Sequence, residues 1–221
     1  MTGLGDSLLY GQNTTGSANW LTLMDDLLPY DVETRLEAYP GDGFAEATTR
    51  FNSYVADTFA PGKLNVILLN TGTNDIYAGA CTLAQYKSRI QTIVSLMRGR
   101  GFKVVVCTVV ARQPASTAED AVRLAANDWL RANWQGFADG LADRAANIAV
   151  ANDVADAANI YIDSGDASKT HFNNLGNATM ATIDAAVVNR LLARAAFTDL
   201  GGTVGASAAV GGGGISPETE M

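Results

Sequence analysis

The chain contains few of the residues from which disulfide frameworks and metal sites are built. Its 221 residues include one histidine, His171, and two cysteines, Cys81 and Cys107. Two cysteines suit neither a disulfide framework nor a zinc site, and one histidine among scattered carboxylates offers no metal-ligand spacing. Cys107 lies inside the apolar run KVVVCTVV and is most simply a buried strand residue. A Cys81–Cys107 disulfide is the alternative, which nothing in the spacing requires.

Positive charge and long apolar runs are also scarce. Lysine and arginine together number 15 against 23 acidic residues, which gives a formal net charge of −8. An acidic chain repels phosphate backbones, so nucleic acid is not expected as a partner. No apolar run approaches the roughly 20 residues of a membrane span, so no membrane partner is expected. No basic leader precedes an apolar segment, so a signal peptide is not expected in this chain.

Apolar runs are nevertheless present, and they have the character of strands. The runs at 64–69 (LNVILL) and 103–110 (KVVVCTVV) are continuous and rich in β-branched residues, which is typical of strands buried on both faces. The segment 147–152 (NIAVAN) is a weaker strand candidate. Alternation over 31–39 predicts a strand nearer an edge. A further short strand is expected to end at Gly5.

Amphipathic stretches separate these runs and predict helices. Thr82 with Gln85, and Ser116 with Glu119, form capping-box patterns at two helix starts. Apolar residues at helical spacing predict helices over about 20–28, 44–59, 82–97, 116–130 and 180–191. Strand–helix alternation of this kind predicts an α/β fold, with a parallel sheet that carries helices on both faces.

The chain is long enough for one domain, expected over 1–197. Nearly half of its residues are apolar, which is enough for a substantial core. The segment 198–221 is rich in Gly, Ala and Ser, without helical or strand period, and is predicted to be a flexible tail or linker. Two interpretations stay open: a module taken from a larger modular protein, or a full protein with a short first strand and a frayed end. A module would favour an extracellular or virion-associated location over a cytoplasmic one.

Polar residues follow each predicted strand, where open α/β sheets form their sites. The segments in question are Gly5-Asp6-Ser7, Gly41-Asp42-Gly43, NTGTND at 70–75, Ala111-Arg112-Gln113 and the loop around His171. Acyl transfer needs a hydroxyl, a base and donors for the developing oxyanion. Ser7 can supply the hydroxyl, and His171 can be the base. The amides of Ser7 and Gly41 and the carboxamide of Asn74 can be the donors, since glycine at 41 leaves no Cβ to block a substrate.

These residues, in this order, resemble the SGNH, or GDSL, hydrolase superfamily. The matching blocks are GDSLL at 5–9, PGDG at 40–43, GTND at 72–75 and THFN at 170–173. The resemblance covers residues 3 to about 195; each block alone is weak evidence, whereas the ordered set is strong. It implies a three-layer α/β/α sandwich with a five-stranded parallel sheet of the flavodoxin-like kind. It also implies a serine ester hydrolase without a cofactor, with Ser7 as the nucleophile.

One block departs from the family pattern. The family places an aspartate three residues before the histidine, and this chain has Ser168 there. Asp166 lies five residues before His171 and Asp163 eight before. Either Asp166 turns back to His171, or a backbone carbonyl orients the ring. We favour Asp166, because a carboxylate also stabilises the imidazolium that forms in the transition state.

Other residues in these segments have structural interpretations. Asp75 is expected to be structural, as a cap for the next helix. Arg112 and Gln113 either line the substrate cleft or belong to a solvated loop. Trp129 and Trp134 are expected to pack in the core or between helices rather than to stack on sugars. Gly-Asp-Ser alone is usually a turn, so the assignment of Ser7 depends on the other blocks.

The expected substrate is a small-molecule or polysaccharide ester. Modular architecture and a polar surface favour removal of O-acetyl groups from a carbohydrate, which is an associational argument. One alternative is a lipase or thioesterase that acts on longer acyl chains. Another is a glycan-binding module of a phage tail or surface protein in which hydrolysis is lost or secondary; the absence of aspartate at position 168 is its best support.

Overall fold

The computed structural model describes residues 1–15, 19–29, 31–112, 115–147, 161–163, 165–166 and 169–199. Within this part of the chain, one sheet contains the strands β1 (Thr2–Gly5), β2 (Arg35–Ala38), β3 (Val66–Asn70), β4 (Lys103–Cys107) and β5 (Gly140–Ala142). The order across the sheet is β2-β1-β3-β4-β5, and every neighbouring pair is parallel. This is the flavodoxin-like order, whose switch point lies between β1 and β3.

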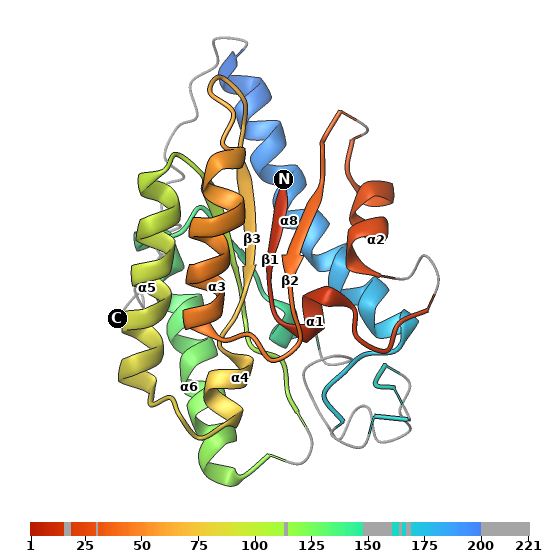
Figure 1. Cartoon of the computed structure of the whole chain (residues 1–221), viewed down its shortest axis with the longest axis vertical. Coiled ribbons are helices and arrows are strands. Elements are labelled where there is room, and N and C mark those ends of the chain that lie inside the picture. The colour runs from red at the N-terminus through yellow and green to blue at the C-terminus, as the bar shows by residue number, and fades with distance from the viewer. Residues whose placement is uncertain are drawn as a thin grey trace, which may run out of the picture.

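Helices cover both faces of this sheet (Figure 1). The α-helices are α1 (Ser7–Tyr10), α2 (Trp20–Leu27), α3 (Phe44–Arg50), α4 (Thr73–Tyr77), α5 (Leu83–Gly99), α6 (Thr117–Asn133) and α8 (Asn174–Asp199). α3 continues into a π-helical turn, η2 (Phe51–Val55), and then η3 (Ala56–Thr58); η4 (Trp134–Gly136) and η5 (Arg144–Ala146) are single 3₁₀ turns. One core cluster joins the sheet to α3, α5 and α6, and a second joins it to α2 and α8. The three-layer α/β/α sandwich with a five-stranded parallel sheet is confirmed.

Several local predictions are confirmed as well. β3 is buried along its whole length, as the continuous apolar run predicts, and β2 forms an edge of the sheet. Capping boxes begin α5 at Thr82 and α6 at Ser116. Trp129 and Trp134 are partly buried against the core, and the Trp129 ring stacks on that of Phe137 with centroids 5.4 Å apart.

The last strand of the described sheet is one that the sequence analysis did not predict. The strand that pairs with β4 is Gly140–Ala142. The predicted strand at 147–152 lies outside the described part of the chain from residue 148 onward. β5 has three residues and none is β-branched, so it gives almost no strand signal. Its glycine has a packing reason: a Cβ at Gly140 would lie 2.8 Å from Cγ1 of Val187 on α8.

Short helices and chain ends add further detail. α1 and α4 are short helices of four and five residues that the sequence analysis did not predict. Cys81 and Cys107 are both buried and both free, so the alternative of a disulfide is wrong. α8 continues to Asp199, and residues 200–221 of the predicted tail lie outside the described part.

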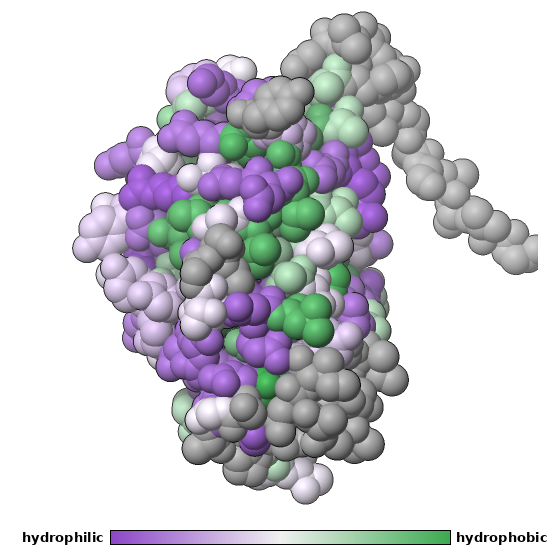
Figure 2. Space-filling view, turned by 90° about the vertical axis from the view of Figure 1, so that its right-hand side faces the viewer, coloured by the Kyte–Doolittle hydropathy of each residue, from purple (hydrophilic) through white to green (hydrophobic). Residues whose placement is uncertain are grey.

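The surface on the side of α2 is partly apolar. Figure 2 shows a strip of apolar side chains between polar ones on this side of the molecule. α2 itself leaves Leu21 and Leu23 half-buried and Leu27 exposed. Among the described helices, none combines the length and the apolar character needed to cross a bilayer.

Candidate active site

Ser7 stands where β1 ends and α1 begins, at the carboxyl edge of the sheet, which is the lower edge in Figure 1. Asp6 caps α1, because its Oδ1 accepts from the Leu8 amide at 3.0 Å. The Gly-Asp-Ser segment is therefore a capped turn, and this turn presents the serine. The Ser7 Oγ lies 2.9 Å from Nε2 of His171.

A narrow hairpin brings Asp166 back to His171. Ile162 pairs with Phe172 in an antiparallel bridge, and the Asp163 amide donates to the His171 carbonyl at 2.9 Å. Asp166 Oδ2 consequently lies 2.8 Å from Nδ1 of His171, inside the expected hydrogen-bond range. The same oxygen accepts from the amides of Thr170 at 3.0 Å and His171 at 2.8 Å.

These contacts determine which ring nitrogen of His171 carries the hydrogen. An ionised Asp166 accepts only, so Nδ1 of His171 carries the hydrogen and donates it. Nε2 is then the acceptor that faces the Ser7 hydroxyl. The Asp163 carboxylate instead accepts from the Gly165 amide at 3.0 Å, and Ser168 lies outside the described part. Of these candidates, Asp166 is the one in contact with the ring.

Apolar contacts join the segment that carries Ser7 to the segment that carries His171. Leu8 follows Ser7 and Phe172 follows His171. Both side chains are buried in one small cluster, together with Val110, Ile162 and Met180. The cluster packs the start of α1 against the segment that carries His171.

The three expected oxyanion donors follow the carboxyl ends of β1, β2 and β3, which are neighbours in the sheet. Among the described residues, neither the Ser7 amide nor the Gly41 amide donates to a protein acceptor. The Asn74 carboxamide, at the start of α4, donates from Nδ2 to the Asp42 carbonyl at 2.9 Å, and its second hydrogen has no protein acceptor in this part of the chain. Gly41 has φ of +88°, and an added Cβ there would meet nothing within 4 Å. The left-handed backbone is thus a second reason for glycine at this position, beside access to its amide.

A family comparison fits this geometry. The model of the GDSL-like lipase/acylhydrolase family matches residues 4–179. The chain belongs to this family. It is therefore a serine ester hydrolase of the GDSL, or SGNH, type.

Solved structures of low sequence identity share the fold of this GDSL hydrolase. A lipolytic protein of the G-D-S-L family from Veillonella parvula has a TM-score of 0.69 and 20% identity, over 86% of this chain and 97% of that one. The acetyl xylan esterase AlAXEase has a TM-score of 0.65 and 17% identity, with coverage of 84% and 97%. TesA has a TM-score of 0.64 and 16% identity, with coverage of 86% and 98%. No curated protein sequence matches the chain.

A buried network of polar side chains lies beside Ser7, and the sequence analysis missed it. Asp6 Oδ1 accepts from Nδ2 of Asn70 at 2.7 Å, and Asn70 Oδ1 accepts from Arg144 at 2.7 Å. Arg144 makes two contacts to Asp184, at 2.9 and 2.6 Å, and Trp20 donates to Asp184 at 2.8 Å. All five side chains are buried. These hydrogen-bonded side chains connect the ends of β1 and β3 to η5, α8 and α2.

This environment changes the acidity of Asp6. Burial raises the pKa of Asp6 to about 6, against the lowering effects of the Leu8 amide and the Arg144 charge. A signal for Asp184 exists in the sequence, since it lies four residues after Met180 and three before Val187, on the apolar face of the last helix. Arg144 carries no comparable signal.

The remaining candidates lie outside the serine–histidine contact. Asp75 is structural, as expected, but it caps an earlier helix: its Oδ2 accepts from the Phe44 amide at 3.0 Å at the start of α3, and its Oδ1 from Arg89 at 2.8 Å. Arg112 lies 5.5 Å from the ring centroid of Tyr77, and Gln113 is outside the described part. In the part of the chain that the structure describes, no three His, Cys, Asp or Glu side chains gather as a metal site requires.

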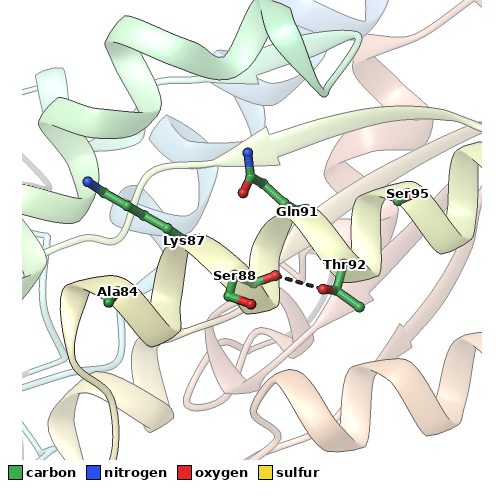
Figure 3. A pocket seen from close by; sticks show the side chains of 6 residues that line it. All are labelled: Ala84, Lys87, Ser88, Gln91, Thr92 and Ser95. Atoms are coloured by element: carbon green, nitrogen blue, oxygen red, sulfur yellow. Dashed lines mark hydrogen bonds between the residues drawn. The ribbon is translucent and has the colours of Figure 1, made fainter.

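A surface hollow on α5 is separate from this site (Figure 3). Its lining consists of Ala84, Lys87, Ser88, Gln91, Thr92 and Ser95, all from one helix. The Thr92 hydroxyl donates to the Ser88 carbonyl of the same helix at 2.8 Å. The hollow contains no nucleophile–base pair, so we assign it no role.

Proposed function

We propose that this hydrolase removes O-acetyl groups from a carbohydrate through an acetyl-enzyme on Ser7. The observation that carries the proposal is the continuous contact from the Ser7 hydroxyl through His171 to Asp166, with distances of 2.9 and 2.8 Å. A serine hydroxyl is a weak nucleophile until a base takes its proton, and this contact supplies the base and its orienting carboxylate.

The reaction begins when Nε2 of His171 takes the Ser7 proton and Oγ attacks the acetyl carbonyl carbon. The charge that develops on the carbonyl oxygen is held by the amides of Ser7 and Gly41 and by the Asn74 carboxamide. Asp166 stabilises the imidazolium that has formed. When the tetrahedral intermediate collapses, the imidazolium gives its proton to the departing sugar oxygen.

Water completes the cycle. His171 takes a proton from a water molecule, whose oxygen attacks the acetyl-enzyme carbon. The second tetrahedral intermediate collapses, the bond from the acetyl carbon to Oγ breaks, and acetic acid is formed. The imidazolium returns its proton to the Ser7 oxygen. The chemistry uses no group beyond these side chains and backbone amides.

Two observations support an acetylated carbohydrate as the substrate. The side chains near the Gly41 loop are polar or amphipathic, namely Tyr10, Tyr39, Asp42 and Arg50, which suits a hydroxylated substrate. A protein of the same fold, AlAXEase, is an acetyl xylan esterase. The argument for a non-hydrolytic glycan-binding module rested on the missing aspartate at 168, and Asp166 supplies a carboxylate in its place.

A substrate series tests the proposal. We expect p-nitrophenyl acetate to be hydrolysed with a higher kcat/KM than the octanoyl ester, and acetate to be released from acetylated xylan. Ser7→Ala is the control, and it should remove nearly all activity on each ester. A preference for octanoyl over acetyl esters would instead support the lipase or thioesterase alternative, since an acetyl site gives little binding to a long apolar chain.

A further inference from the structure

Two exposed tyrosines lie against each other beside the nucleophile. The side chains of Tyr10 and Tyr39 are 47% and 49% exposed. Their ring centroids are 6.2 Å apart, and the ring planes are inclined by 34°. Large aromatic side chains are usually covered, so an exposed pair at one place indicates a surface for a ligand.

The backbone ties both rings to the catalytic loops. Tyr10 ends α1, the turn that Ser7 begins, and residues three apart in a helix share a face with Cβ atoms roughly 5–6 Å apart. The Tyr39 amide donates to the Gly5 carbonyl at 3.0 Å, and the Tyr39 carbonyl accepts from the Asp42 amide at 3.2 Å. Tyr39 thus lies between the end of β1 and the loop that carries Gly41. In Figure 1, α1 lies at the lower end of β2, close to where this loop begins.

One of the two rings is held in place. The Arg50 guanidinium lies over the Tyr39 ring, 3.6 Å from its centroid, and the same arginine forms an ion pair with Asp42. The Asp42 carbonyl in turn accepts from Asn74. A ring that is fixed before binding loses less conformational freedom when a ligand arrives. Arg50 therefore covers one face of the Tyr39 ring, while Tyr39 as a whole is still 49% exposed.

We propose that Tyr10 and Tyr39 form a subsite for the saccharide ring of the ester's alcohol part. The proposal rests on the proposed function, in which the acyl group is acetyl and has no ring, so a ring beside Ser7 belongs to the alcohol. Tyrosine combines an apolar body with a polar tip, which matches the apolar faces and hydroxyl edges of a sugar. The neighbouring charges of Arg50 and Asp42 make this surface unsuitable for a long acyl chain.

The test compares acetyl esters that differ in the alcohol. Steady-state kinetics are measured with a mono-O-acetylated methyl pyranoside, phenyl acetate and ethyl acetate, for the wild type, Tyr10→Ala and Tyr39→Ala. We expect each variant to lose roughly tenfold in kcat/KM on the pyranoside, mainly through KM. Ethyl acetate should change less than about twofold, because it has no ring. Tyr39→Phe keeps the ring and should retain most of the pyranoside activity.

Tyr54→Ala is the matched control. Tyr54 is 54% exposed and lies ten residues beyond the start of α3, about 15 Å along the helix from the carboxyl edge of the sheet. Its replacement should leave kcat/KM unchanged for all three substrates. Equal losses on the pyranoside and ethyl acetate, or no loss on the pyranoside, would overturn the subsite. A loss of kcat/KM on phenyl acetate alone would indicate a subsite for an aryl group instead of a saccharide, and would also overturn the assignment.

A binding measurement separates this subsite from the proposed reaction. In the Ser7→Ala background, titration with the acetylated pyranoside should give a Kd that rises roughly tenfold when Tyr39→Ala is added. This result would support the subsite even for an enzyme that hydrolysed no acetyl ester. If the Kd does not depend on Tyr39, the subsite is wrong, whatever the hydrolytic activity.

Discussion

Replacement of Asp6 by asparagine should change how the stability of the protein depends on pH. Asp6 is 1% exposed, and burial raises its pKa from 3.8 to about 6. The folded state therefore holds the proton more tightly than the unfolded chain. The stabilisation that this gives is complete below about pH 3.8, and it is lost as the pH rises through about 6. A rise of the pKa from 3.8 to about 6 corresponds to roughly 3 kcal/mol in total.

The asparagine introduced by Asp6→Asn would be neutral at every pH and would keep an oxygen for the Leu8 amide and for Asn70. The wild type should therefore lose stability relative to Asp6→Asn by roughly 2–3 kcal/mol between about pH 4 and pH 7.5. Urea unfolding of both proteins at several pH values in this range measures the difference, and contributions from other titrating groups cancel. A difference that stays constant with pH would refute the reasoning. The opposite trend would mean that the charge of Arg144 keeps Asp6 ionised.

Four further substitutions test the candidate site and the buried residues that support it. Asp166→Ala should lower kcat well below the wild type but less than Ser7→Ala does, whereas Asp163→Ala should change it little; a larger loss from Asp163→Ala in p-nitrophenyl acetate assays would contradict the hairpin geometry. Asn74→Ala should lower kcat about 10²–10³-fold with a small change in KM, and an unchanged kcat would remove it from the oxyanion hole. Arg144→Met leaves Asp184 buried without its partner and should cost about 3–5 kcal/mol in urea unfolding. A cost below about 1 kcal/mol would show that the pair is not needed.

The elements that the sequence predicted well are those whose own residues determine them. β3 and β4 are continuous apolar runs, so their burial follows from hydrophobicity alone. α5 and α6 begin at capping boxes, which are local hydrogen-bond patterns. β5 is different, because its three residues become a strand through pairing with β4 and packing against Val187. Such a strand depends on the tertiary structure and has no local signal.

The candidate site shows the same difference between features that local residues determine and features that depend on the tertiary structure. The contact between Ser7 and His171 could be predicted, because serine and histidine are residue types that acyl transfer uses and their order along the chain matches the family. The contact of Asp166 with His171 was predictable because SGDAS favours a turn. The pair of Arg144 and Asp184 joins residues far apart in sequence, and each charge alone suggests a solvated surface. The contact of Tyr10 with Tyr39 likewise depends on how two strand ends lie side by side.

The central claim, that Ser7 is the acylated nucleophile, can be tested by covalent labelling. The wild type is treated with diethyl p-nitrophenyl phosphate, whose phosphoryl group transfers to an activated serine, and the adduct is located by peptide mass spectrometry. We predict one adduct, on the peptide that contains Ser7, with loss of esterase activity in proportion to labelling. His171→Ala should label far more slowly, because the base that activates Ser7 is absent. An adduct on another residue, or esterase turnover that persists in Ser7→Ala, would contradict the account.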